Sequence, residues 1–172
     1  MRPDYHIRRA TTHDATVVAR HRVAMFRDMG DLPDEAIAEQ LFESSRTALA
    51  AFLADGSYAG WLAVTGGGDV LGGAGAHVKP QLPRIAPNGA RLETAPVPLV
   101  VNVYTEPRCR RTGIARALMQ ELLRWAVVEG FDRVLLHASA AGRPLYASLG
   151  FVATNEMRWA PGAPGAIVDA NE

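Results

Sequence analysis

Hydrophobic and polar positions alternate with two different periods, and each change of period marks an expected element. A short strand is expected from Tyr5 to Arg9. Behind it, residues 11–14 offer capping groups, and apolar side chains then recur every three or four positions up to Met29, which predicts an amphipathic helix. A second helix of the same period is expected between a capping Asp34 and the Asp55-Gly56 pair. The chain therefore opens with one strand and two helices.

The middle of the chain reads as strands. Tyr58 to Thr65 and Val70 to Val78 are β-type stretches joined by Gly66 to Asp69, which suits a tight hairpin of two antiparallel strands. The segment from Pro80 to Pro98 contains five prolines and is expected to be an irregular loop. Val97 to Thr105 is apolar on both alternating faces, which is typical of a central strand that is covered on both sides.

The last third returns to helical period. A long amphipathic helix is expected from Thr112 to Glu129, and a strand is expected from Arg133 to Ala138. A strand, a long helix and a strand of this size form a right-handed crossover, so this strand should run parallel to the central one. A short helix from Arg143 to Leu149 follows. A final hairpin of Phe151-Val152 with Met157-Arg158-Trp159 completes the expected mixed α/β architecture.

Composition bounds the class of protein. The 172 residues, 48% apolar and 21% charged, suit one compact domain over residues 1–160 with a flexible tail at 161–172. Cys109 is the only cysteine, and neither a leader nor an apolar run near 18 residues is visible, so we expect a cytoplasmic protein without a membrane partner. The 18 basic and 18 acidic residues balance, which removes the electrostatic argument for binding nucleic acid.

The junction of the central strand and the long helix carries the clearest chemical signal. The first amide N–H groups of a helix have no internal partner, and the helix dipole is positive there, so a phosphate finds donors already aimed at it. Gly113 and Ala115 let an anion approach the backbone, and Arg108, Arg110 and Arg111 add positive charge. The pattern predicts a diphosphate site. Neither a P-loop motif nor a dinucleotide fingerprint is present, and the glycines from Gly66 to Gly75 suit a turn with small strand residues.

Two motifs at this junction and after it resemble those of a known family. Arg110-Arg111-Thr112-Gly113-Ile114-Ala115 fits the pattern [Q/R]-x-x-G-x-[G/A], and Pro144-Leu145-Tyr146-Ala147-Ser148-Leu149-Gly150-Phe151 is similar to a second family block. Their order, their spacing of about 30 residues and the order of elements from Tyr5 to Trp159 resemble the GNAT superfamily of acetyl-CoA-dependent N-acetyltransferases. The resemblance implies a mostly antiparallel twisted sheet of six to seven strands with about four helices, whose central parallel pair is splayed to admit CoA.

The resemblance also assigns roles. Tyr146 would protonate the departing CoA thiolate, since a phenol with a pKa near 10 stays protonated at neutral pH beside a thiol whose pKa is near 8.5. Many relatives have asparagine and alanine seven and four residues before this tyrosine, where this chain has Ser139 and Gly142; Ser139 can still donate a hydrogen bond to CoA. The cofactor-binding residues implied are the diphosphate cradle Arg110, Arg111, Thr112, Gly113, Ile114 and Ala115, the strand backbone of Asn102, Val103 and Tyr104, and Ser139. No metal is implied.

Residues on the acceptor side stay open at this stage. His77 and His137 are candidates for the base that removes the amine proton, although a half-buried strand histidine is the commoner role, and the direction of Glu106 is unpredictable. Cys109 is expected to have no catalytic role. Two groups could serve either the acceptor or the structure: the helical side chains of Arg22, Met25, Phe26 and Met29, and the acidic Asp28, Asp31, Asp34 and Glu35.

The function expected from the resemblance is transfer of an acetyl group from acetyl-CoA to a primary amine of a small molecule or peptide, directly within a ternary complex. The alternative is a non-catalytic acyl-CoA-sensing or protein-binding module on the same fold. The absence of an obvious carboxylate on the central strand and the presence of Ser139 both favour this alternative. Dimers are common in the family, so a homodimer is a further expectation.

Overall fold

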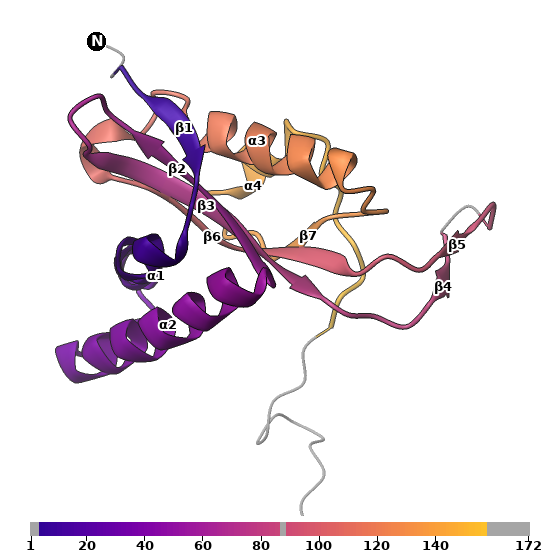
Figure 1. Ribbon diagram of the computed structural model, residues 1–172, viewed down its shortest axis with the longest axis horizontal. Helices are drawn as coiled ribbons and strands as arrows, with labels where there is room; N and C mark the ends of the chain where they lie inside the picture. The colour runs from indigo at the N-terminus through magenta and orange to yellow at the C-terminus, as the bar shows by residue number, and fades with distance from the viewer. Residues whose placement is uncertain (1–3, 87–88, 158–172) are drawn as a thin grey trace, which may run out of the picture.

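The computed structural model describes residues 4–86 and 89–157, which form a twisted sheet between two layers of helices (Figure 1). The main sheet has five strands in the order β1-β2-β3-β6-β7. Its pairs are antiparallel except for β6 and β7, which are parallel. The expected mixed, mostly antiparallel sheet is confirmed, with five strands instead of six to seven. These strands are β1 (His6–Arg9), β2 (Tyr58–Val64), β3 (Val70–Lys79), β6 (Val97–Thr105) and β7 (Leu135–Leu136).

Helices cover both faces of this sheet (Figure 1). On one face, α1 (Ala15–Met29) and α2 (Glu35–Asp55) share a core with Leu62 and Val64 of β2. On the other face, α3 (Ile114–Val128) packs on Trp61 and Ala76, and the short α4 (Arg143–Ala147) joins the same core. Among the described helices, none has both the length and the apolar character that crossing a membrane requires.

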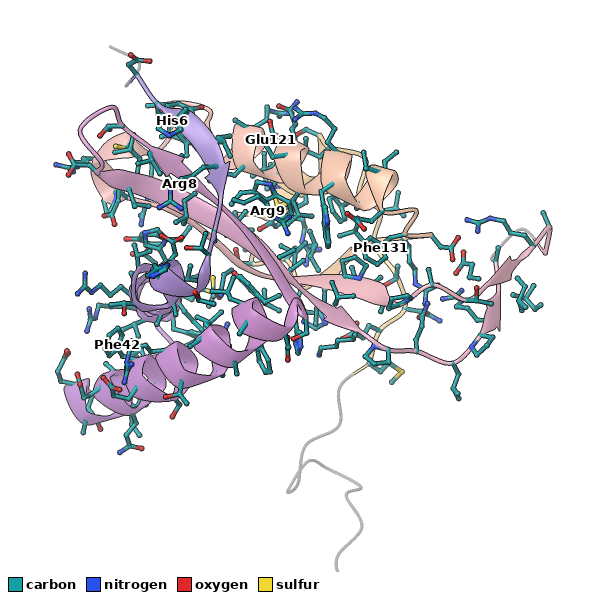
Figure 2. The ribbon with its side chains drawn as sticks, viewed as in Figure 1. His6, Arg8, Arg9, Phe42, Glu121 and Phe131 are labelled. Atoms are coloured by element: carbon teal, nitrogen blue, oxygen red, sulfur yellow. The ribbon has the colours of Figure 1, made fainter. Side chains whose placement is uncertain are left out.

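Strand β1 shows how one alternation serves both layers (Figure 2). Arg8 turns toward α1 and forms an ion pair of 2.8 Å with Asp14, which ends the 3₁₀ turn Thr12–Asp14 and also accepts a hydrogen bond from the Thr11 amide at 2.8 Å. Arg9 turns the other way and lies 4.4 Å above the ring of Trp61. Asp34 caps α2 by accepting from the Ile37 amide at 2.8 Å, as the sequence predicts.

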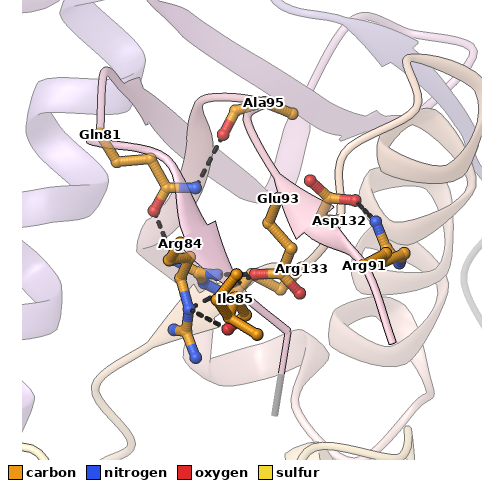
Figure 3. A network of polar contacts seen from close by, with 8 residues as sticks. All are labelled: Gln81, Arg84, Ile85, Arg91, Glu93, Ala95, Asp132 and Arg133. Atoms are coloured by element: carbon orange, nitrogen blue, oxygen red, sulfur yellow. Dashed lines mark hydrogen bonds and ion pairs between the residues drawn. The ribbon is translucent and has the colours of Figure 1, made fainter. Parts of the chain in front are cut away.

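The segment expected to be an irregular loop is instead a projecting arm (Figure 1). Its strands β4 (Arg84–Ile85) and β5 (Leu92–Glu93) form a separate antiparallel pair. A polar network holds the arm (Figure 3): Arg133, just before β7, donates to Glu93 and to Gln81, and Gln81 donates to the Ala95 carbonyl at 2.7 Å. The Glu93 side chain is only 5% exposed, and Arg84 Nε lies 3.6 Å from the same carboxylate oxygen, so two arginines compensate its burial.

The end of the chain departs furthest from expectation. The strand expected from Arg133 to Ala138 is only the two residues of β7, and α4 ends at Ala147 instead of Leu149. The final hairpin is wrong for Phe151-Val152, because the described residues 151–157 contain no strand; Arg158 and Trp159 lie outside the described residues. The Phe151 ring packs its edge on Tyr146, with 5.9 Å between the centroids, so its apolar character reflects core packing.

Candidate active site

The turn between β6 and α3 has an unusual backbone. After the 3₁₀ turn Pro107–Cys109, Arg111 has a φ of 63° and Gly113 a φ of 95°. Arg111 is the only residue other than glycine with positive φ in the described ranges, and such a conformation is tolerated where the surrounding structure demands it. Gly113 caps the start of α3 in the left-handed region that glycine adopts without strain. The two left-handed residues bend the chain into a concave cradle.

The amides of this cradle are free. Within the described part of the chain, the N–H groups from Arg111 to Ala115 donate no hydrogen bond, and the first amide to reach back is that of Ala117, which donates to the Gly113 carbonyl at 3.0 Å. The Thr112 hydroxyl donates to the Cys109 carbonyl at 2.6 Å, and this bond does not involve the Thr112 amide. Free amides at the positive end of a long helix are the arrangement of donors that suits an anion with several oxygens; binding of a diphosphate here stays a prediction.

One member of the predicted cradle is already engaged. The Arg110 amide donates to the Pro107 carbonyl at 3.3 Å, so the free row begins one residue later. The Arg110 guanidinium pairs with Asp28 of α1 and donates to the Thr105 carbonyl at 3.1 Å. Arg108 and Arg111 are exposed, and their side chains form no ion pair with any residue that the structure describes. These two arginines therefore supply the mobile positive charge beside the cradle.

An open edge of β6 leads away from the cradle. Strand β7 pairs only with Leu99 and Val100. The register against β3 then shifts at Val101, a β-bulge that lies between the pairs Ala76–Val100 and Gly75–Asn102. Bulges bend a strand and increase its twist, which accounts for the early end of the parallel pairing. Beyond the bulge, residues 102–104 pair with β3 on one side and with none of the described strands on the other.

Tyr146, in α4, packs against the core on the α3 side of the sheet, and Ser139 lies between β7 and α4. The Tyr146 ring is half-buried in the core below α3, and this burial raises the pKa of its hydroxyl. That hydroxyl makes no hydrogen bond with any described residue. A Cβ at Gly142 would lie 2.8 Å from the Tyr146 ring, so glycine leaves the ring its place. The Ser139 hydroxyl oxygen accepts from the Gly142 amide at 3.2 Å and keeps its own proton to donate.

A polar cluster lies on the α1 side of β6; sequence reasoning named Arg22 and Asn102 separately but missed their contact and the role of Tyr58. The Asn102 side chain is buried, and its amide nitrogen donates to the Tyr58 hydroxyl at 3.4 Å. Arg22 of α1 donates from Nη1 to Asn102 Oδ1 at 3.0 Å and to the Val101 carbonyl at 3.5 Å. Burial raises the pKa of Tyr58 to about 12, so the phenol is neutral. A Cβ at Gly75 would lie 1.9 Å from the Tyr58 hydroxyl, which explains a glycine at this strand position.

His21 forms a second pair on the same face. Its ring packs on Tyr104 with 5.0 Å between the centroids, and its Nε2 lies 3.8 Å from Glu106 Oε1. Burial lowers the pKa of His21 to about 4, so the imidazole is neutral at pH 7. A cavity of about 10 Å³ between α1 and the sheet is lined by His21, Tyr58 and Asn102 and has the size of a single water molecule.

The histidines expected as bases have other neighbours. His77 is half-buried, as expected for a strand histidine, and stacks on Phe52 of α2 with 4.6 Å between the centroids. His137 is exposed, because β7 ends before it, and its Nε2 lies 2.6 Å from Glu156. Cys109 is buried in the core below α3, in keeping with a packing role. Among the residues described, no group of three or more potential ligands is arranged to hold a metal ion.

The structure shows the environment of the residues on α1 and before α2 whose roles the sequence left undecided. Met25 and Phe26 are half-buried and Met29 is exposed. Three of the four acidic side chains bind other groups of the protein: Asp28 pairs with Arg110, Asp34 caps α2, and Glu35 pairs with Arg27 at 2.9 Å. A hollow of about 440 Å³ lies at the base of the arm beside Ser57 and Gln81, and none of the predicted site residues lines it.

Comparison with known proteins identifies this arrangement. Residues 24–151 match the model of the acetyltransferase (GNAT) family. Among solved structures, a GCN5-related N-acetyltransferase from Ralstonia eutropha JMP134 is 32% identical, with a TM-score of 0.78 over 91% of this chain and 98% of that chain. No curated protein sequence matches the chain significantly.

Two more distant structures share the fold. A predicted acetyltransferase from Clostridium acetobutylicum, solved with acetyl-CoA, is 24% identical, with a TM-score of 0.76 over 91% of this chain and 96% of that one. A ribosomal-protein-alanine N-acetyltransferase from Brucella melitensis is 18% identical, with a TM-score of 0.61 over 91% and 100% of the two chains. Because the family model spans well over half of the sequence, the chain belongs to the GNAT acetyltransferase family.

Proposed function

We propose that this protein transfers the acetyl group of acetyl-CoA to a primary amine of a small molecule or peptide, directly within a ternary complex. The observation that carries the proposal is the row of free amides from Arg111 to Ala115, placed where the open edge of β6 begins. A diphosphate fits the amides, and an extended arm of amide groups fits the edge. The Clostridium structure, solved with acetyl-CoA, supports the choice of cosubstrate.

Each predicted residue then has one task. The amides of the cradle hold the diphosphate, and Arg108 and Arg111 add charge beside it. The backbone of residues 102–104 pairs with the pantetheine arm as a neighbouring strand would. Ser139 donates its hydroxyl proton to the cosubstrate, since its oxygen already accepts from Gly142. Binding of the cosubstrate therefore depends mainly on the position of backbone groups and less on the identity of the side chains.

The reaction step moves one acyl group and two protons. The amine nitrogen attacks the thioester carbonyl carbon, the C–S bond breaks, and the departing thiolate takes the proton of Tyr146. Burial keeps this phenol protonated at neutral pH, so it is available as the acid. Neither His77, which packs on Phe52, nor His137, which is exposed beside Glu156, is singled out as the base. The amine therefore gives its proton to water, and Tyr146 regains a proton from water, which balances the step.

The test measures binding and turnover separately. Calorimetry with acetyl-CoA reports binding, and release of the CoA thiol reports transfer to a panel of primary amines and peptide N-termini. We expect both. Binding without thiol release for any acceptor would instead indicate the non-catalytic acyl-CoA-sensing or protein-binding module, which the lack of a carboxylate within β6 favours. No binding would refute the cradle.

A further inference from the structure

Arg22 is a cation at the bulge of β6 without an acidic partner. Its guanidinium is half-buried, which lowers its pKa, and it lies 5.0 Å from the Phe26 ring. Its two printed hydrogen bonds, to Asn102 Oδ1 and the Val101 carbonyl, both leave from Nη1 and both reach neutral acceptors. Nη2 and Nε donate to no group in the ranges that the structure describes. The half-buried guanidinium of Arg22 thus has two adjacent donor groups, Nη2 and Nε, that form no hydrogen bond with the described residues.

Within the described residues, no acidic side chain forms an ion pair with Arg22. Asp28 pairs with Arg110, and Glu35 pairs with Arg27. Glu106 lies 3.8 Å from His21, whose imidazole is neutral. Tyr58, the remaining titratable group of the cluster, stays protonated. Burying a charge is unfavourable unless a counter-charge or hydrogen bonds compensate it. The positive charge of Arg22 is therefore left for a group outside the protein.

We propose that Arg22 binds a carboxylate of the acceptor, so that the acceptors are amines with a carboxylate near the amino group, as in free amino acids. This inference rests on the proposed function, because transfer at the open edge of β6 is what brings an acceptor to the bulge. The unused fork of Nη2 and Nε matches a carboxylate in a bidentate pair. A single guanidinium neutralises one negative charge, which favours a carboxylate over a dianionic phosphate.

The surroundings of Arg22 make this recognition selective. Asn102 and the Val101 carbonyl hold Nη1, and the Phe26 ring restricts the guanidinium on one side, so its orientation is set before the acceptor arrives. The amino group, one or two carbons from the bound carboxylate, then lies beside the bulge. An amine without the carboxylate would leave the fork unpaired, which lowers its transition-state binding.

The test compares acceptors that differ only in the carboxylate. We would use L-phenylalanine, L-phenylalaninamide and phenethylamine, with kcat/KM expressed per unprotonated amine because the amine pKa values differ. The expected preference for the acid is about 10- to 100-fold, the range for one charged hydrogen-bonded pair. Arg22→Gln should reduce it to about one, and Arg22→Lys should retain part of it. Arg20→Gln, on the exposed side of α1, should keep the full preference.

A second measurement needs no turnover. Calorimetry of the protein saturated with CoA should detect N-acetyl-L-phenylalanine but not N-acetylphenethylamine, and Arg22→Gln should remove the difference. Melting temperatures confirm that each variant is folded. Equal kcat/KM for acid and amine, or an equal loss for both in Arg22→Gln, would overturn the inference and leave the proposed function standing. Carboxylate binding through Arg22 without any thiol release would overturn the proposed function, and with it the assignment of the bound carboxylate to an acceptor.

Discussion

The two faces of β6 recognise their surroundings by different means. On the α3 side, Val100 and Val103 enter an apolar core, and the proposed cosubstrate meets backbone groups at the open edge and in the cradle. On the α1 side, Asn102 and Tyr104 are polar or aromatic, and they meet the side chains of α1. Strand β6 thus presents an apolar face and backbone groups on the α3 side, and particular polar and aromatic side chains on the α1 side.

This difference separates what the fold provides from what the individual residues provide. The cradle needs a strand, a turn with positive φ and a helix start, and any sequence that forms these presents the same amides. The cluster around Asn102 needs Arg22, Tyr58 and Gly75 together, and a change at one alters the others. Substitutions on the two faces should therefore fail in different ways.

The largest effect is expected at Gly113. A Gly113→Val side chain at a φ of 95° strains the turn and places methyl groups among the free amides, so binding of acetyl-CoA should become undetectable by calorimetry. Gly130→Val is the matched control, because Gly130 also has positive φ and open space but lies beyond the other end of α3. Equal affinity in the two variants would show that the cradle does not bind the diphosphate.

Tyr146→Phe should come next. Removal of the proposed acid should lower kcat about 100-fold, while the affinity for acetyl-CoA stays unchanged because the half-buried ring keeps its place on Phe151. Steady-state kinetics and calorimetry give the two numbers. Tyr5→Phe, a partly buried tyrosine of the same core, controls for the loss of a hydroxyl. A variant with full kcat would remove Tyr146 from the mechanism.

Gly75→Ala tests the α1 face through stability. The new Cβ would lie 1.9 Å from the Tyr58 hydroxyl, so Tyr58 or β3 must shift, and we expect the free energy of unfolding to fall by about 3 kcal/mol. Urea denaturation measures it. Gly66→Ala, where nothing lies within 4 Å, should change stability by less than about 1 kcal/mol. Similar values for both would mean that the cluster is loosely packed.

His21 gives the smallest effect, as a dependence of stability on pH. Its folded pKa of about 4 lies below the ordinary value of 6.5, so the unfolded chain binds the extra proton first. Stability is therefore complete above pH 6.5 and falls by about 2 kcal/mol as the pH drops to 5. Urea denaturation at pH 7, 6 and 5 should show this slope, and His21→Gln should remove it. An unchanged slope in the variant would assign it to another group.

The fold was predictable wherever one segment carried its own pattern. The strand Val97–Thr105 has the expected bounds, and α2 begins after Asp34 as its capping side chain predicts. The arm and β7 were not predictable, because each has strands of only two residues and depends on distant partners. Arg133 meets Glu93, 40 positions away, and no local periodicity reports such a contact.

The candidate site divides in the same way. Gly113 and its neighbours form one continuous motif, so their geometry follows from a helix start that comes directly after a strand. Arg22 and Asn102 are 80 positions apart, and Tyr58 and Asn102 are 44 apart, so the cluster exists only in the folded chain. Sequence reasoning named Arg22 as a possible acceptor-side residue, and a further signal was the pair Gly73 and Gly75, spaced by two on a strand, where bulky neighbours occupy the space of the missing side chains.

The bulge at Val101 adds one residue to β6 that has no partner on β3. Cross-strand pairs on either side of it, Ala76 with Val100 and Gly75 with Asn102, are neighbours on β3, so the sheet would be continuous without residue 101. That residue is a spacer that the ladder does not require. We expect its deletion to straighten β6 and to extend the pairing with β7, which would close the edge that we propose for the acyl donor.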